Sequence, residues 1–135
     1  MTTRRVLMVA AVLMPFVLTA WGKHTRVVIA APTDKSEVPE RPVVEGSVSD
    51  NSARVWVIVH PMEVPDYWVQ PSVSVDPGGT WRVMIHVGRP GNDDVGKQYE
   101  ILAVTDPKQA LKDGTVLDGW PRARARSQIV NVTRR

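Results

Sequence analysis

Three histidines and a pair of adjacent aspartates are the residues of this 135-residue chain that could hold a metal ion. His60 ends one expected strand and His86 lies inside another, so the two imidazoles could approach each other across a sheet. A metal site would need a further ligand, which Asp93 or Asp94 could supply. His24 lies next to the N-terminal hydrophobic segment. We favour ordinary surface or strand-end histidines, and we expect neither a metal nor a cofactor.

The sequence contains no complete motif for other kinds of catalytic or metal chemistry. The stretch GNDDVG (Gly91–Gly96) offers two carboxylates, but they lack the one-three-five spacing of a calcium loop, and adjacent residues of an extended loop point apart. We expect a solvated hairpin loop there. The chain has no cysteine, no G-x-S-x-G or S-x-x-K serine motif and no phosphate-binding glycine loop. We therefore expect a protein that is not an enzyme.

Aromatic residues are the better candidates for binding, because the chain has five tryptophans. Trp56 and Trp81 fall on expected strand faces and are predicted to be core residues. Trp68 and Trp120 lie in the turn-rich contexts PDYWVQP and DGWPRAR, and Tyr67 precedes Trp68. Exposed aromatic rings can stack on sugars or anchor a protein partner. These last three residues are our candidate ligand-binding residues, and the alternative is that they cover open ends of the fold.

The C-terminal stretch RARAR forms a predicted basic edge. Side chains alternate along an extended segment, which places Arg122, Arg124 and Arg126 on one face, with Arg134 and Arg135 following. Such an edge could contact anionic lipid headgroups, lipopolysaccharide or an acidic partner. We favour two simpler interpretations: protection of an edge strand from aggregation, or pairing with acidic groups of the body.

The net charge of +3 conceals an uneven distribution along the chain. Residues 23–120 carry 10 Lys/Arg and 14 Asp/Glu, whereas residues 121–135 carry five Arg and no acidic residue. A nucleic-acid-binding domain more often has a basic face across the whole fold. We therefore expect no nucleic-acid partner.

The first 22 residues, which we expect to form a hydrophobic leader helix, have the three parts of a secretory signal. Arg4 and Arg5 are followed by an apolar run of 13 residues ending at Leu18, and Ala20-Trp21-Gly22 is a small-x-small cleavage site. An uncleaved signal-anchor is the alternative, although its 17 uncharged residues fall a little short of a ~30 Å hydrocarbon core. Both interpretations place the following domain outside the cytoplasm, in the periplasm or at the cell exterior.

The remaining chain, residues 23–135, is expected to form one domain of about seven short strands. Apolar residues alternate with period two between turn residues, in the stretches Thr25–Pro32, Pro42–Ser49, Ala53–Pro61, Tyr67–Val75, Thr80–Val87, Gln98–Thr105 and Ser127–Thr133. The third stretch is apolar on both faces, which indicates a central or doubly covered strand. Residues 33–41 and 106–126 are expected to be long connections, the second with one helical turn after Pro107. The pattern predicts an antiparallel β-sandwich.

The pattern VWVIVHP…YWVQPSVSVDPGGTWRVMIHVG…VGKQYEILAVT resembles the immunoglobulin-like modules of bacterial surface and envelope proteins. Trp56 lies mid-strand, where that family places a buried core tryptophan. The stretch Gly79–Trp81 opens the strand that follows the sheet-switching turn. Tyr99 lies two residues before Ile101, as the tyrosine-corner residue lies two before the second cysteine of an antibody domain.

The resemblance covers roughly residues 25–133 and concerns the fold more than the activity. It implies that Ile101 stands at one position of the usual disulfide, and that Gly46 or Val48 stands at the other. Apolar packing would then replace the disulfide in this chain.

Together these features predict an exported, non-catalytic binding or structural module of the bacterial cell envelope, with a protein or a glycan as its partner. One alternative is a signal-anchored accessory subunit of a membrane complex. Another is a small secreted carbohydrate-binding protein. Contact with the membrane is expected only through the leader, if it is not cleaved.

Overall fold

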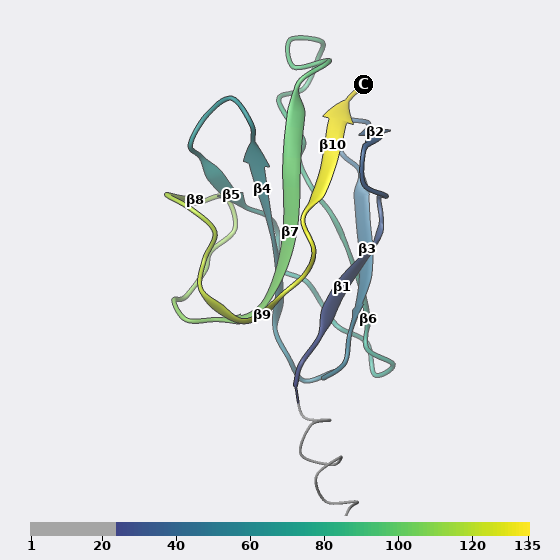
Figure 1. Cartoon of the computed structure of the whole chain (residues 1–135), viewed down its shortest axis with the longest axis vertical. Helices are drawn as coiled ribbons and strands as arrows, with labels where there is room; N and C mark the ends of the chain where they lie inside the picture. Colours follow the sequence, from purple (N-terminus) through teal and green to yellow (C-terminus); the bar gives the residue numbers. More distant parts are fainter. Residues whose placement is uncertain (1–23) are drawn as a thin grey trace, which may run out of the picture.

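The computed structural model describes residues 24–135, so the predicted leader lies outside the described residues. Residues 24–135 form ten strands and no helix, arranged in two sheets (Figure 1). The first sheet has the order β1 (Val27–Ala31), β3 (Val43–Val48), β6 (Thr80–Met84). The second has the order β2 (Ser36–Val38), β10 (Val130–Arg134), β7 (Gln98–Pro107), β4 (Val55–Pro61), β5 (Tyr67–Val69), β8 (Val116–Leu117), and β9 (Ala123–Arg126) also pairs with β7. Within this part of the chain, no helix could span a membrane.

The prediction of an all-β protein with two sheets is confirmed, and each of the seven expected strands is present with adjusted ends. Nearly all neighbouring strands are antiparallel, and the exception is β2, which runs parallel to β10. The two expected connections were partly wrong, because residues 33–41 contain β2 and residues 106–126 contain β8 and β9. The helical turn expected after Pro107 is wrong, since the chain there forms bends and turns.

The core lies between the two sheets and follows the alternation of the sequence. Val55, Val57 and Val59 of β4 point inward, and they are at most 2% exposed. Trp81 of β6 is 3% exposed and lies against Gly46 of β3, where an added Cβ atom would be 2.4 Å from the indole ring. The small residue on β3 therefore makes room for the large one on β6.

Trp56 is a correction to the predicted core. It lies on the opposite face of β4 from the inward valines and is only half-buried, outside the cluster that fills the space between the sheets. The same outer face also carries Ile58, Leu102 and Val104, none of which is exposed. Strand β4 is thus covered on both sides, as its two-sided apolar sequence predicted, and the core tryptophan is Trp81.

Strands β9 and β10 act as one interrupted partner of β7. Arg126 of β9 pairs with Val104, and Val130 of β10 pairs with Ile101, so three residues stand opposite two. Ser127 stabilises this bulge, because its N–H donates to the Ala103 carbonyl at 2.8 Å and its Oγ accepts from the Ala103 N–H at 3.0 Å. The RARAR stretch is consequently held beside the C-terminal end of β7.

Candidate functional site

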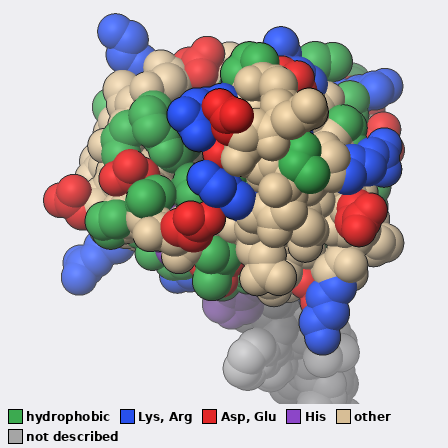
Figure 2. Space-filling model, turned by 90° about the horizontal axis from the view of Figure 1, so that it is seen from above, with side chains coloured by type: hydrophobic (Ala, Val, Ile, Leu, Met, Phe, Trp, Pro, Cys, Tyr) green, Lys and Arg blue, Asp and Glu red, His purple; other side chains and the backbone are tan. Residues whose placement is uncertain are grey.

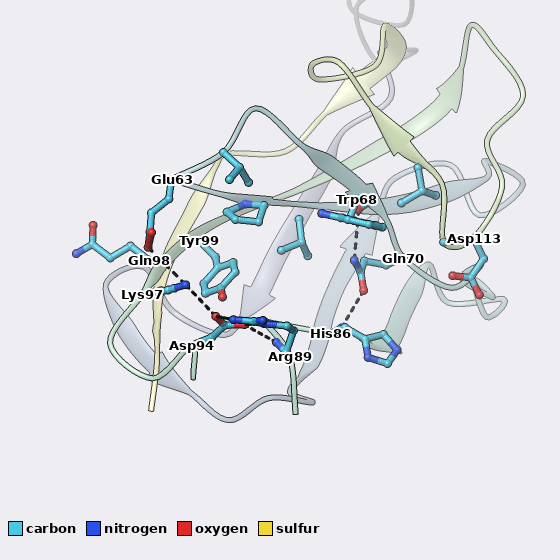
Figure 3. A pocket seen from close by; sticks show the side chains of 16 residues that line it. Glu63, Trp68, Gln70, His86, Arg89, Asp94, Lys97, Gln98, Tyr99 and Asp113 are labelled. Carbon is cyan, nitrogen blue, oxygen red and sulfur yellow. Dashed lines mark hydrogen bonds and ion pairs between the residues drawn. The ribbon is translucent and has the colours of Figure 1, made fainter. Parts of the chain in front are cut away.

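The second sheet contains more strands than the first, and a pocket lies on the part of its inner face formed by β4 and β5. Trp68 pairs with Val59, which places its side chain on the face directed toward the first sheet. Trp68 is nevertheless 40% exposed. It forms one wall of a pocket of about 560 Å³, which Figure 3 shows from close by.

The floor of the pocket is apolar. Val59 of β4 and Tyr99 of β7 line it with side chains that are at most 3% exposed. Burial raises the pKa of the Tyr99 hydroxyl. Pro61 and Val64 extend the apolar surface toward the rim. A ligand entering here would therefore meet a preformed hydrophobic base.

Gln70 forms a polar side wall next to Trp68 (Figure 3). It is 4% exposed, its Oε1 accepts from the His86 N–H at 2.8 Å, and its Nε2 donates to the Trp68 carbonyl at 3.3 Å. The amide thus joins β5 to the segment after β6. Each end of the amide retains one further hydrogen-bonding position.

The opposite wall is a charged cluster built around Asp94, which is 5% exposed. Its Oδ2 accepts from the Arg89 N–H at 2.7 Å and from Arg89 Nε at 3.2 Å, while its Oδ1 accepts from Arg89 Nη2 at 3.2 Å and Lys97 Nζ at 3.0 Å. The Arg89 guanidinium and amide, with Lys97, hold the pKa of Asp94 well below its usual range. The carboxylate in turn raises the pKa of Arg89 and of Lys97.

This arrangement corrects our expectation of a plain solvated loop at residues 91–96. Asp94 is buried and both of its oxygens are occupied, so it orients Arg89 and Lys97 and is not itself a free acid or base. The cations keep donors that can reach a ligand: the Arg89 side chain is 69% exposed and the Lys97 side chain 39%.

Arg134 holds the loop that carries Arg89, and it does not belong to the basic edge as predicted. It is 4% exposed, and its guanidinium donates to the carbonyls of Val87 at 2.9 Å, Arg89 at 2.8 Å and Gly91 at 2.5 Å. Gly88 lies between these carbonyls with φ +81°, and a Cβ atom there would be 2.6 Å from the Tyr99 hydroxyl. The loop is thus shaped by a buried arginine and a glycine without a side chain.

The structure brings two of the three aromatic candidates together, Tyr67 and Trp120, and separates them from Trp68. Tyr67 lies on the other face of β5 from Trp68 and stacks on His60, with ring centroids 4.0 Å apart. Trp120 packs edge-on against both rings, at 4.8 Å from Tyr67 and 5.9 Å from His60. The ring of His60 is fixed by Glu100 Oε1 at 2.9 Å from Nδ1 and by the Val64 carbonyl at 2.9 Å from Nε2. We call Tyr67, His60 and Trp120 the outer aromatic cluster.

The histidines lie apart and find separate surroundings. His60 belongs to the outer aromatic cluster, whereas His86 lines the pocket on the inner side. Asp93 is exposed in the loop, and Asp94 is occupied by the two cations. Within residues 24–135, no group of three or more His, Cys, Asp or Glu side chains could hold a metal ion.

The basic edge is present for three of the five predicted arginines. Arg124 and Arg126 of β9, and Arg122 directly before it, are exposed and alternate with half-buried alanines. Arg124 pairs with Asp50 at 3.1 Å and with Asp106 at 3.3 Å, so this residue does contact acidic groups of the body.

Sequence reasoning identified Trp68 but missed Gln70, Arg89 and Lys97 as pocket residues. The glycines of GRPGNDDVGK were the one sequence feature that could have indicated a specific loop conformation. In the structure, Gly88, Gly91 and Gly96 all have positive φ. No family model matches the chain, and no curated protein matches it.

Proposed function

We propose that the chain is an exported, non-catalytic immunoglobulin-like module of the bacterial cell envelope, and that it binds a glycan in the pocket beside Trp68. The observation that carries the proposal is a partly exposed tryptophan in the wall of a preformed pocket of about 560 Å³. Such a volume lies within the range of small-ligand sites, ~300–1,000 Å³. The immunoglobulin-like assignment is supported by two facing sheets and by the buried Tyr99 near the start of β7.

The charge balance of the pocket favours a neutral, polar ligand. Arg89 and Lys97 stand against three carboxylates of the lining, those of Asp94, Glu63 and Asp113. An anion would meet Glu63 and Asp113, and a cation would meet Arg89 and Lys97. A purely apolar ligand would bury charges without partners, which is unfavourable. A sugar has an apolar ring face for Trp68 and hydroxyl groups for the surrounding donors and acceptors.

Calorimetric titration of the full chain with neutral soluble oligosaccharides of the cell envelope tests the proposal. We expect one of them to bind, and Trp68→Ala to weaken that binding at least about tenfold, because the stacking surface is lost. Trp120→Phe is the matched control, since it alters an aromatic residue on the other face of β5, and it should bind as the unaltered chain does. Absence of binding by every oligosaccharide, or equal binding by Trp68→Ala, would overturn the proposal.

A further inference from the structure

We propose that the end of the sandwich at which β1 begins faces the membrane and binds anionic phospholipid headgroups. Six cationic side chains gather there, and we call them the basic end: Arg26, Arg54, Lys108, Arg122, Arg124 and Arg126. All six are exposed or partly exposed. This inference does not depend on the glycan pocket, which lies on other strands.

Backbone hydrogen bonds fix the position of the basic end. The Ser49 N–H donates to the Arg26 carbonyl at 2.9 Å, and the neighbouring Asp50 accepts from Arg124 Nη1 at 3.1 Å. These two contacts place the start of β1 and strand β9 around the same turn between β3 and β4. His24, the first described residue, lines a surface hollow together with Arg124.

Two further backbone hydrogen bonds hold Arg54, Lys108 and Arg122 at the same end. The Asp106 N–H donates to the Arg54 carbonyl at 2.9 Å, and the Lys108 N–H donates to the Arg122 carbonyl at 2.8 Å. Arg126 follows on β9, where it pairs with Val104. Figure 1 shows β9 and the beginning of β1 at the same, lower end of the molecule.

Most of these cations are not neutralised by the body. Among residues 24–135, Arg124 is the one member of the basic end that forms an ion pair, with Asp50 and Asp106. Two other carboxylates lie nearby: Asp76, whose pKa is lowered by hydrogen bonds from Thr80, and Asp118. Six cations therefore face four carboxylates, whereas the other described residues carry eight Lys/Arg and ten Asp/Glu.

The opposite end of the sandwich lacks this feature. Figure 2 shows it from above, with basic and acidic side chains interspersed among hydrophobic ones. Arg89 and Lys97 share Asp94 there, and Arg134 is buried under the loop. Arg41 and Arg135 at this opposite end are exposed as well, but they do not gather with four further cations as the members of the basic end do.

The short segment before β1 supports a membrane as the binding partner of the basic end. Four residues, 23–26, separate the predicted leader from Val27. Fully extended, they span at most ~14 Å, at ~3.5 Å per residue. A leader held in a membrane would therefore keep the basic end close to the headgroups, within about one or two Debye lengths at physiological salt. Because ~14 Å is the maximum span, a less extended segment brings these arginines within one Debye length, where they are attracted to anionic lipids.

The chain has no cysteine, so a single fluorophore can be placed at will. Gln109→Cys puts a label next to Lys108, and Asn92→Cys puts one in the loop at the opposite end; both positions are exposed. The full chain is reconstituted into vesicles of phosphatidylcholine alone or of equal parts phosphatidylcholine and phosphatidylglycerol. Quenching by a headgroup spin-labelled lipid then reports the distance of each label from the membrane surface.

We expect the label at position 109 to be quenched at least about twofold more in the anionic vesicles, and the difference to vanish at high salt. The label at position 92 should not respond. The triple variant R26E/R122E/R126E should lose the difference, and the neutral variant R26Q/R122Q/R126Q should lose part of it. The matched variant K35E/R41E/R82E changes three exposed cations elsewhere and should keep it.

Three results would overturn the proposal. Equal quenching in both vesicles would mean that the leader alone sets the distance. Loss of the difference in the matched variant would mean that only net charge matters. Absence of quenching in every vesicle would leave an acidic protein as the partner of this end. A failed glycan titration with successful quenching would refute the pocket proposal alone.

Discussion

Tyr67 and Trp68 are neighbours in sequence but occupy opposite kinds of surface. Tyr67 lies on the outer face of β5, where His60 and Trp120 cover it at centroid distances of 4.0 and 4.8 Å. Trp68 lies on the inner face, where no aromatic ring packs against it in the described residues, and 40% of its surface is exposed. The ring of Tyr67 is thus covered by side chains of its own chain, whereas the ring of Trp68 is accessible from the pocket.

The difference comes from what lies over each face of the sheet. The outer face is covered by the segment that carries β8 and Trp120, and that segment is part of the same chain. The inner face near β5 extends beyond the first sheet, and it is bordered by a loop stabilised by polar contacts. Aromatic residues alone therefore do not mark a binding site; an open ring beside fixed polar groups does.

Arg134→Leu is expected to have the largest effect, and it should act on the inner pocket. Removing the guanidinium leaves the carbonyls of Val87, Arg89 and Gly91 without their buried donor. We expect a loss of about 3 kcal/mol in the free energy of unfolding, measured by urea denaturation.

The matched control is Arg135→Leu, the same change one residue later. Arg135 is exposed, and its guanidinium donates to the Glu37 carbonyl at the long distance of 3.5 Å. A loss in the control as large as that in Arg134→Leu would show that the buried contacts do not support the pocket.

Trp120→Ala should have a smaller effect and should act on the outer aromatic cluster. The half-buried indole packs edge-on against Tyr67 and His60. We expect a loss of about 1–2 kcal/mol in the free energy of unfolding, because an aromatic contact and some apolar burial disappear. Trp120→Phe keeps an aromatic ring and should recover part of this loss. If Trp120→Ala lowers stability no more than Trp68→Ala does, the contrast between the two faces is wrong.

The sequence predicted the elements of the fold better than the arrangement of the pocket. Alternation in β4, β6 and β7 marked the strands, because burial on one face imposes a period of two. The same alternation could not decide which tryptophan lies in the core, since Trp56 and Trp81 both alternate with apolar residues. That choice depends on Gly46, which lies across the sheet from Trp81.

The pocket depends on contacts between residues far apart in sequence. Gln70 meets His86 across 16 residues, and Arg134 meets Arg89 across 45. No local pattern encodes such pairs. The short β2, β8 and β9 were missed for a similar reason, because each exists by pairing with a distant strand and has little apolar alternation of its own.

Of the three substitutions at Arg134, Trp120 and Asp94, Asp94→Asn should have the smallest effect on the free energy of unfolding. It should also change how that free energy depends on pH. The ion pairs with Arg89 and Lys97 hold the pKa of Asp94 below its ordinary value of 3.8. The charged carboxylate therefore stabilises the folded state at any pH above that value, and this contribution is lost as the pH falls toward the lowered pKa. The loss caused by Asp94→Asn should be full at neutral pH and should shrink below about pH 4. Urea denaturation at pH 7 and in acid measures it, with the exposed Asp93→Asn as the matched control. A loss that is the same at both pH values would mean that the charge of Asp94 does not hold this wall of the pocket, and the open face of β5 would then depend on Arg134 alone.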